Sequence, residues 1–464
     1  MHYSSGDVFK GLLLTCLLCA LGGPQTRGDD PTGPWRLRDR IIVDREAWGW
    51  NWSSWDQEKI VTFGDYQYTV YWDADKVLVL VRRNLRGGGF QRLRLAKFTL
   101  TNNDRHRNTC LGVSPADGRL HLSWDHHNDP LRYSKSRAGF LTEPPVKISA
   151  SDIEPAQPML ADRKLESRVT YPRFLTDRKG HLLLIYRVGA SGNGHHYLHR
   201  YDPKQAKWFR LGMAFSARGL YAPWNNSKSR CAYFHDLLFD RRNRLHVTWV
   251  YRETGASWAS NHDLHYAYSD DGGLTWHSNA REKIADLAAG DPIELADPGI
   301  VVCKIPVYSW LMNAGCMALD SKDRPHVVTF RLPTRYHPEK LKHSPPADIR
   351  GRICFYHYWR DGDGTWHVGG PVDPHGSLTK RPDVVFDRRD TLHFFYTTKQ
   401  GFRCMTSAAD DRWGNWSSHL MTSPEWAAND ATKHDRIRWR EKSILSLTAR
   451  LEPKGFAILD FVLE

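Results

Sequence analysis

Residues 104–130 read DRHRNTCLGVSPADGRLHLSWDHHNDP, and this stretch decides the fold. A short apolar run is followed by a turn signal at Pro115–Gly118 and then by the alternating run LHLSW. Strand, turn and strand in this order predict a β-hairpin. Residues at equal distances from a hairpin turn lie opposite each other, so we expect His106 to meet His126 and His127 at its open end.

The turn and the second strand of this hairpin recur along the chain. Each copy begins at an acidic residue and runs into an apolar strand, the first and last being looser than the rest: Asp73, Asp117, Asp177, Asp240, Asp320, Asp387 and Glu452. Four copies place a histidine at nearly the same position, which we interpret as structural: His121, His246, His326 and His393. A period of about sixty residues built from strand–turn–strand units is typical of propeller blades.

We therefore predict an all-β, seven-bladed β-propeller that uses residues 31–464 as a single domain. Residues 61–100 are expected to form the first clear blade, and the Trp-rich residues 33–60 to close the ring against the last one. A second motif agrees, because residues 269–276 read SDDGGLTW and fit Ser-x-Asp-x-Gly-x-Thr-Trp, the Asp box of propeller blades. Its Ser and Asp can bind loop amides while Thr and Trp pack beneath, so the box indicates a fold and not an activity.

The N-terminus has the features of an export signal. Lys10 precedes an apolar run at residues 11–23 that is too short to span a membrane, and polar sequence follows. We predict a signal peptide at residues 1–24, with cleavage between Ala20 and Gly28, and a secreted chain that is extracellular or periplasmic. No other stretch reaches membrane-spanning length, so no membrane insertion is expected.

Charge and composition indicate the class of partner. The formal net charge is +13, which for an exported chain favours an anionic polymer. No nucleic-acid module and no Lys/Arg block is present, so of these polymers we expect an anionic polysaccharide and no nucleic acid; an ordinary basic surface is the competing interpretation. We also expect a monomer. The 19 Trp and 19 Tyr residues suit packed sheets first and a carbohydrate groove second. Six cysteines outside the signal permit disulfides without defining the pairs.

The open ends of three successive hairpins gather imidazole, phenol and guanidinium groups on one face, where propellers bind ligands. These groups are, in chain order, His106, His126, His127, Tyr171, Arg187, Tyr233 and Arg252. Tyr171 and Arg187, for example, are equidistant from the turn near Lys179, so they should reach the same face of the ring. Each group also has a structural interpretation, the arginines as ion-pair partners between blades and the tyrosines as core aromatics.

The signals for a metal or a catalytic acid are weaker. His262 and His265 are three residues apart in an expected strand and should point to opposite faces, so we retain His235 with His262 as the metal pair. No His-Glu-x-x-His occurs, and no Cys-x-x-Cys outside the signal, so a catalytic zinc is not expected. Glu253 is the best-placed acid for glycoside hydrolysis, but no second carboxylate matches it.

Several motifs resemble those of secreted BNR-repeat β-propellers, the family that includes ulvan lyases and related rhamnose–glucuronate lyases and rhamnosidases. The resemblance spans nearly the whole chain after the signal and rests on His106–Asn108, Asp125–Asn128, Thr170–Phe174, Tyr186–Arg187, Ser191–Gly194, Asn261–Leu264 and the Asp box. It implies a site of two histidines, two tyrosines and an arginine.

By motif and spacing the resemblance maps catalytic roles to His106, His126 and Tyr171 and substrate binding to Arg187. His127 is an alternative to His126. The second tyrosine is Tyr233, with Tyr221 in reserve. The remaining substrate-binding residues that we expect are His127, Asn108 and Arg252.

The resemblance implies a polysaccharide lyase that cleaves an ulvan-like, uronic-acid-containing glycan by β-elimination. Arg187 would neutralise the sugar carboxylate, a histidine or tyrosine would take the neighbouring proton, and Tyr171 would donate to the leaving oxygen. Which group is base and which is acid stays open. No cofactor is required, although a structural divalent metal, zinc or calcium, is compatible with the family. The alternatives are a rhamnosidase-type hydrolase of the same fold and a non-catalytic carbohydrate-binding propeller.

Overall fold

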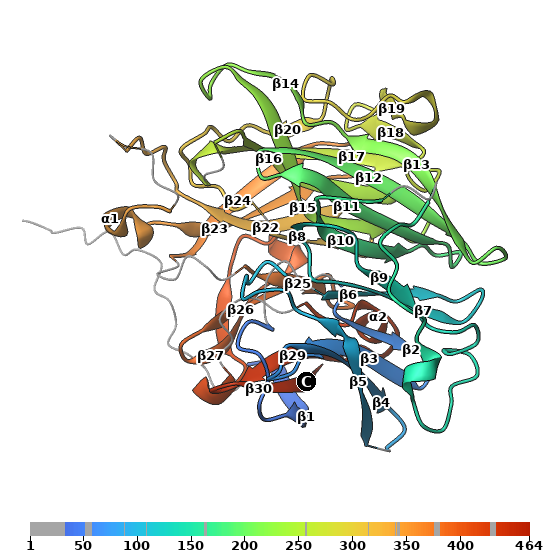
Figure 1. Cartoon of the computed structure of the whole chain (residues 1–464). Coiled ribbons are helices and arrows are strands. Elements are labelled where there is room, and N and C mark those ends of the chain that lie inside the picture. The colour runs from blue at the N-terminus through green and yellow to red at the C-terminus, as the bar shows by residue number, and fades with distance from the viewer. Residues whose placement is uncertain are drawn as a thin grey trace, which may run out of the picture.

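The computed structural model describes residues 33–464 apart from gaps at 52–57, 88, 108, 162–164, 256–257, 314, 339, 341–343, 375–380 and 427–432. The described strands form seven sheets, and all their strand pairs are antiparallel (Figure 1). The predicted signal peptide at residues 1–24 and the predicted site residue Asn108 lie outside the described residues.

The first three sheets are numbered here in chain order. Sheet 1 contains β2 (Ile60–Phe63), β3 (Tyr66–Trp72), β4 (Val77–Asn84) and β5 (Phe90–Thr99). Sheet 2 contains β6 (Thr109–Ser114), β7 (Arg119–Trp124) and β9 (Tyr133–Lys135). Sheet 3 contains β8 (His127–Asp129), β10 (Val169–Thr176), β11 (Leu182–Ala190), β12 (Asn193–Asp202) and β13 (Lys207–Phe215).

The remaining sheets continue this order. Sheet 4 contains β14 (Arg218–Tyr221), β15 (Ser227–Phe239), β16 (Leu245–Glu253), β17 (Asn261–Ser269), β18 (Thr275–Ser278), β19 (Lys283–Asp286) and β20 (Val301–Cys303). Sheet 5 contains β21 (Cys316–Leu319), β22 (Pro325–Arg331), β23 (Cys354–Arg360) and β24 (Trp366–Pro374), and sheet 6 contains β25 (Asp383–Phe386), β26 (Leu392–Thr398), β27 (Gly401–Ser407) and β28 (Ser417–Leu420). Sheet 7 contains β1 (Trp35–Asp44), β29 (Leu445–Leu451) and β30 (Gly455–Leu463).

Helices are few and short. The α-helices are α1 (Ala347–Arg350) and α2 (Arg436–Lys442), and the 3-10 helices are η1 (Ala150–Asp152), η2 (Trp258–Ser260), η3 (Leu287–Ala289), η4 (Ala409–Asp411) and η5 (Pro424–Trp426). Within the described residues, no helix is long and apolar enough to cross a membrane. The six cysteines that the structure describes are all free thiols.

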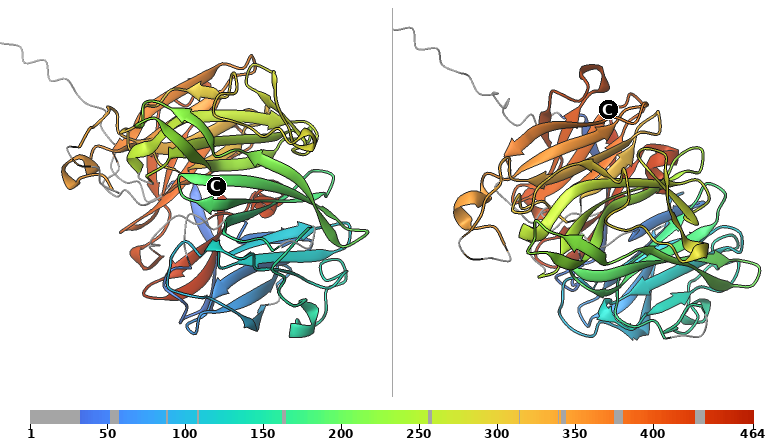
Figure 2. Two further views of the ribbon diagram at one scale, coloured as in Figure 1. Left: turned by 45° about the horizontal axis from the view of Figure 1, so that its top comes forward. Right: turned by 90° about the horizontal axis from the view of Figure 1, so that it is seen from above.

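The sheets follow one another around a ring (Figure 2). Among the described residues, seven hydrophobic clusters fill the boundaries between consecutive sheets. The cluster between sheets 7 and 1 completes the circle, and there Tyr71 stacks on Phe456 with ring centroids 4.6 Å apart. Inner strands such as β16 are buried along their whole length, polar and charged residues included.

The predicted all-β propeller is confirmed. Each of the seven repeat copies lies at a hairpin turn, one in every sheet, and β1 pairs with β30 to close the ring as residues 33–60 predict. The prediction of seven blades is confirmed only in part, because the sheets are unequal, with three to seven strands each. Six sheets are built from neighbouring stretches of chain, whereas sheet 7 combines the first strand with the last two.

The recurring acidic residue caps its own turn. At Asp240, Asp320 and Asp387, Oδ1 accepts the backbone N–H groups two and four residues later, at 2.8–2.9 Å. In the same three turns Oδ2 lies 3.4 Å from Nε2 of the histidine six residues later. The repeated histidines are therefore buried partners of their own turns, as the structural interpretation predicts; His121 is also buried but contacts the Tyr133 hydroxyl instead.

These turns make stability depend on pH. Burial alone would raise the pKa of Asp387, but hydrogen bonds from His393 and the turn amides lower it to about 2. Because this value lies below the ordinary aspartate pKa of about 3.9, the carboxylate stabilises the fold above that pH and loses its contribution as pH falls toward 2. We expect Asp387→Ala to lower the free energy of unfolding at pH 7 and to lose most of that effect near pH 2, measured by urea denaturation across pH. An equal effect at both pH values would contradict the assignment.

The Asp box also has the predicted arrangement. Asp271 accepts the backbone N–H of Leu274 and Thr275 at 3.0 and 2.9 Å and the Ser269 hydroxyl at 2.8 Å. Trp276 is fully buried and donates to the Gly273 carbonyl at 3.0 Å. The motif therefore orders the turn between β17 and β18.

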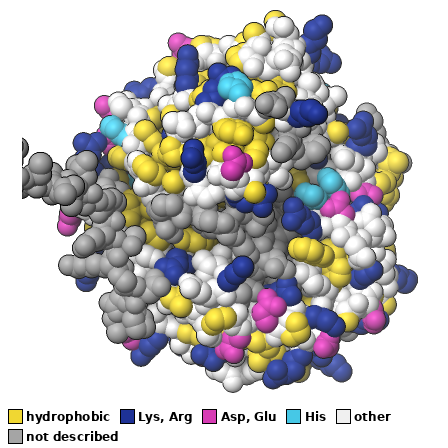
Figure 3. All heavy atoms as spheres, turned by 90° about the vertical axis from the view of Figure 1, so that its left-hand side faces the viewer, with side chains coloured by type: hydrophobic (Ala, Val, Ile, Leu, Met, Phe, Trp, Pro, Cys, Tyr) yellow, Lys and Arg dark blue, Asp and Glu magenta, His cyan; other side chains and the backbone are white. Residues whose placement is uncertain are grey.

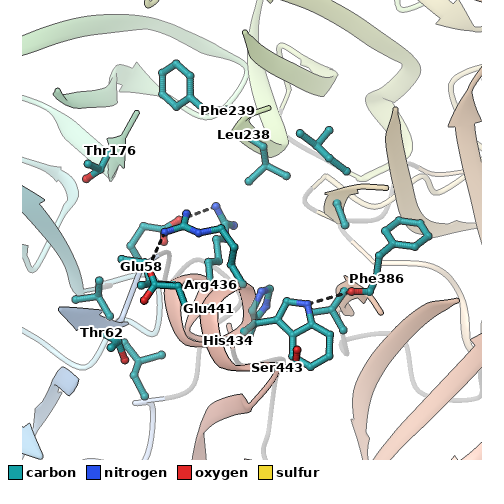
Figure 4. A pocket seen from close by; sticks show the side chains of 18 of the residues that line it. Glu58, Thr62, Thr176, Leu238, Phe239, Phe386, His434, Arg436, Glu441 and Ser443 are labelled. Atoms are coloured by element: carbon teal, nitrogen blue, oxygen red, sulfur yellow. Dashed lines mark hydrogen bonds and ion pairs between the residues drawn. The ribbon is translucent and has the colours of Figure 1, made fainter. Parts of the chain in front are cut away.

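The segment that begins α2 ties several sheets together across the ring. Arg436 pairs with Glu58 ahead of β2 at 3.0 Å (Figure 4). Arg436 also pairs with Asp236 of β15, which in turn pairs with Arg173 of β10 at 2.8 Å. His434 binds Asp383 of β25 at 2.7 Å. A cavity of about 1290 Å³ lies beside this segment, among the hairpin turns of the inner strands. The buried ion pairs therefore hold the ring together at the side that carries the turns.

Candidate active site

The candidate site lies at the open ends of the inner hairpins, on the side of the ring away from the turns. In sheet 3, Thr170 pairs with His127 of β8 on one side and with Arg187 of β11 on the other. β8 reaches this position because the chain leaves sheet 2 after Trp124 and joins sheet 3 (Figure 1). His127 therefore follows the second repeat in the sequence but lies in sheet 3.

Arg187 is the centre of the predicted group. Its guanidinium lies 5.1 Å from the Tyr171 ring centroid and 5.9 Å from that of Tyr233, and it donates to the Tyr233 hydroxyl at 3.2 Å. Its side chain is fully buried, and two of its nitrogens, Nε and one terminal amine, have no hydrogen-bond partner in the described chain. A buried cation with open donors is suited to bind an anion.

A second arginine lies on the other side of Tyr233. Arg252 stands with its guanidinium 4.7 Å from the Tyr233 ring centroid and donates to Asn261 at 2.8 Å. The Ser191 hydroxyl lies 2.9 Å from the Tyr233 hydroxyl. Neither Arg187 nor Arg252 forms an ion pair with a carboxylate of the described residues, so this part of the chain gives no support to their interpretation as ion-pair partners between blades. Tyr233, rather than Tyr221, is the tyrosine beside them.

Tyr171 has an unusual backbone. Its φ is +54°, and the register between β10 and β11 shifts at this point, so Tyr171 bulges from the strand. Residues in such a conformation are enriched at functional sites. Burial and the neighbouring Tyr233 raise the pKa of Tyr171 above its ordinary value, although Arg187, Arg252 and Arg381 lower it. The phenol therefore keeps its proton at neutral pH.

His106 and His127 meet on one carboxylate. Their ring centroids are 4.5 Å apart, His106 Nδ1 lies 2.6 Å from one oxygen of Asp104, and His127 Nδ1 contacts the other. Burial lowers the pKa of His106 to about 4, with Asp104 acting in the opposite direction. His106 is therefore neutral at pH 7, so it can accept a proton.

The position of the histidines corrects the predicted hairpin. The β6–β7 ladder ends at Thr109 and Trp124, and Asp125 then takes a φ of +62°, so the arms do not extend to His106 and His127. The partner of His106 is His127 and not the predicted His126. His126 is fully buried, and its Nε2 accepts the backbone N–H of Arg132 at 2.8 Å.

The predicted metal pair, His235 with His262, is not part of any group of three or more possible metal ligands among the described residues. His262 has both nitrogens at 3.0 Å from carboxylates, Nε2 from Glu253 and Nδ1 from Asp263. His235 is fully buried at the shifted register of β15, and burial lowers its pKa to about 3. The neighbour of His262 is His265: ligand atoms of these two residues and Asp263 lie within 4.8 Å of one another.

A second backbone bulge explains why His262 lies beside His265. Asp263 has a φ of +52°, and the register between β16 and β17 shifts across it, so residues three apart come to the same side. Our expectation that His262 and His265 point to opposite faces is therefore wrong.

Glu253 is not placed as a catalytic acid. It is fully buried, and Arg230 binds both of its oxygens, at 2.8 and 3.0 Å. Burial raises the pKa of Glu253, but His262 and Arg230 outweigh this and lower it. A carboxylate held in this way stays ionised and away from solvent, so it cannot donate a proton to a glycosidic oxygen.

Two residues of the site have no predicted role. Asp104 holds both histidines, and its only signal is its place two residues before His106. Arg381 is buried, acts on the pKa of Tyr171, and donates to Asn313 at 2.9 Å. It lies two residues ahead of β25, the first strand of sheet 6, and nothing in its sequence context marks it. Lys and Arg side chains are otherwise spread over the face in Figure 3.

Comparisons with known proteins agree with this architecture. Residues 66–374 match the family described as BNR repeat-containing family member. The short isoform of ulvan lyase from Alteromonas sp. (strain LOR) is 28% identical over 244 residues, 42% of this chain and 43% of that protein. A long isoform from Pseudoalteromonas sp. (strain PLSV) is 26% identical over 264 residues, 49% of this chain and 26% of that protein. The chain thus spans less than half the length of these curated relatives.

Solved structures extend the likeness to nearly the whole chain. The crystal structure of polysaccharide lyase Uly1 has a TM-score of 0.70 at 14% identity and covers 92% of this chain and 99% of that chain. A PL25 ulvan lyase bound to -[GlcA(1-4)Rha3S]- has a TM-score of 0.62 at 12% identity, covering 92% and 96%. At these identities the likeness shows a shared fold.

Proposed function

Because the chain belongs to the BNR repeat-containing family, which its residues 66–374 match, we propose that it is an exported polysaccharide lyase. It cleaves a uronic-acid-containing glycan of the ulvan-like, rhamnose–glucuronate class by β-elimination. The observation that carries this proposal is the pair Arg187 and Arg252, buried around Tyr233 with no carboxylate partner among the described residues. The relatives named ulvan lyase support the substrate class.

The two arginines supply the positive charge that the reaction needs in its first step. A uronate carboxylate is negative, and its charge opposes loss of the proton on the adjacent carbon. The planar fork of Arg187 can bind both oxygens of that carboxylate and offset the charge as the carbanion develops. Leaving buried guanidinium groups without a counter-ion is costly, so an anionic sugar stabilises a site that is otherwise unpaired.

The proton transfers follow from the protonation states of His106 and Tyr171. Neutral His106 takes the proton from the carbon next to the carboxylate, and the electron pair forms a carbon–carbon double bond. The bond from the neighbouring carbon to the glycosidic oxygen then breaks. Tyr171, which is still protonated, gives its proton to that oxygen. His106 is therefore the base and Tyr171 the acid in this proposal.

A resident cofactor has no part in this chemistry. If the chain holds a structural divalent metal, His262, Asp263 and His265 would bind it, because Nε2 of His265 is buried with no hydrogen-bond partner in the described chain. Two imidazoles and a carboxylate suit zinc better than calcium. Metal analysis of the purified protein tests this assignment.

The test of function is an activity screen over acidic polysaccharides. A lyase creates an unsaturated uronate that absorbs in the ultraviolet, whereas a rhamnosidase-type hydrolase releases sugar without new absorbance. Binding without either product would indicate a carbohydrate-binding propeller. The buried, bidentate ion pair of Glu253 favours the lyase over the hydrolase.

Arg187 gives a direct check of the site. We expect Arg187→Lys to lower kcat/KM about 10²-fold, because one amine replaces a two-pronged donor. Arg178→Lys is the matched control, since Arg178 lies at a hairpin turn on the far side of the ring. Ultraviolet assays of both variants would contradict the proposal if they lost the same activity.

A further inference from the structure

Asp104 lies between the two imidazoles of the candidate site. It belongs to the loop that joins β5 to β6, and its side chain is 29% exposed. Oδ1 accepts the backbone N–H of His106 at 2.9 Å and lies 2.6 Å from His106 Nδ1, while Oδ2 contacts His127 Nδ1. One carboxylate thus binds an imidazole of its own loop, His106, and one of β8, His127.

These contacts decide which edge of each ring is left for other partners. Nδ1 and Nε2 lie on different edges of an imidazole, so a ring whose Nδ1 contacts Asp104 turns its Nε2 away from it. An ionised carboxylate can only accept hydrogen bonds, so Nδ1 must carry hydrogen in both rings. In a neutral ring the lone pair is then on Nε2.

Asp104 stays ionised for a local reason. Its burial raises the pKa, but the backbone N–H of His106 and the imidazoles of His127 and His106 lower it below the ordinary value. The charged groups that act on His106 are Asp104, His127 and Arg105. Because the rings are adjacent, a proton on one opposes a proton on the other.

We propose that Asp104 is a positioning residue that holds both His106 and His127 in the tautomer with hydrogen on Nδ1, which puts the lone pair of each ring on Nε2. This inference rests on the proposed lyase function and adds a residue that the motifs did not assign.

Asp104→Asn separates this role from simple packing. The amide has the same shape, but it offers one accepting oxygen and one donating amine. It can accept from only one Nδ1–H, and its amine forces the other ring to place hydrogen on Nε2. We expect kcat to fall about 10- to 100-fold, with KM little changed. We also expect ¹⁵N NMR of the imidazoles to show one ring in the changed tautomer.

Asp129→Asn is the matched control. Asp129 accepts the backbone N–H of His127 at 3.0 Å and pairs with Arg107 at 2.8 Å, but it contacts no imidazole nitrogen. It should leave both tautomers unchanged. The inference is overturned if Asp104→Asn keeps the wild-type kcat and tautomers, or if Asp129→Asn changes the tautomers in the same way.

The wild-type spectrum decides the case even if a variant does not fold. Hydrogen on Nδ1 of both rings supports the inference, and hydrogen on Nε2 of either neutral ring overturns it. If the chain cleaves no acidic polysaccharide, the lyase proposal fails, but this spectrum still tests what Asp104 does.

Discussion

His106→Ala and Tyr171→Phe should each lower lyase activity by about 10²–10⁴-fold, the usual contribution of a positioned general base or acid. His106→Ala removes the neutral imidazole that takes the proton. Tyr171→Phe keeps the ring that packs against Arg187 and removes only the hydroxyl that donates to the leaving oxygen. Initial rates of ultraviolet absorbance on an acidic polysaccharide measure both effects.

Two control variants test whether the losses are specific. His181→Ala removes an exposed histidine at a hairpin turn, and Tyr268→Phe removes a hydroxyl from a buried ring of β17. Both should keep nearly full activity. The catalytic assignment fails if His106→Ala and Tyr171→Phe degrade the polysaccharide as fast as the wild type.

The pH dependence of kcat/KM should follow the protonation of His106 and Tyr171. The pKa of His106 is about 4, so the base is active above that pH and is lost as the pH falls through it. The pKa of Tyr171 is raised, so the acid keeps its proton well above neutral pH. We expect kcat/KM to fall on the acid side near pH 4 in wild type, a limb that His106→Ala should lack.

Asp236→Ala should destabilise the fold by about 3–5 kcal/mol, because it removes the shared partner of two arginines in the interior. Asp236 is fully buried and pairs with Arg173 at 2.8 Å and with Arg436. These arginines come from sheet 3 and from α2, so the loss also loosens the segment that spans the ring. Urea denaturation of the wild type and the variant measures the difference.

A surface pair provides the comparison for Asp236. Asp75 is 79% exposed and pairs with Arg94 at 2.9 Å, so Asp75→Asn should cost no more than about 1 kcal/mol. Equal unfolding midpoints for the two variants would contradict the view that the interior ion pairs of Asp236 stabilise the ring on the side of the hairpin turns.

The repeat could be predicted from the sequence because its chemistry is local. An aspartate that caps amides two and four residues later recurs in the turns, and such turns predict hairpins without knowledge of the rest of the chain. Hairpin counting also placed Tyr171 and Arg187 together, because the register is set by the turn between them. The number of strands in each sheet could not be predicted. The chain leaves sheet 2 at Asp125, whose φ is positive, and then forms β8 in sheet 3.

One-residue shifts in the register of a strand had the largest effect on which residues form the site. Side chains alternate between faces along a strand, so a single inserted residue exchanges which of two neighbours is exposed. The reversal at Asp125 buries His126 and brings His127 to His106, and the bulge at Asp263 brings His262 to His265. Positive φ at aspartate leaves no pattern that periodicity can detect.

The ring, the capped turns, and the tyrosine–arginine group of sheets 3 and 4 could be predicted, because these depend on contacts within one hairpin or between consecutive ones. The folded chain was needed to choose His127 over His126, to show that Asp104 binds both rings, and to show that Arg187 and Arg252 have no acidic partner in the described chain. Those features depend on which side chains from distant segments meet, and burial makes the absence of a counter-ion costly enough to indicate a ligand.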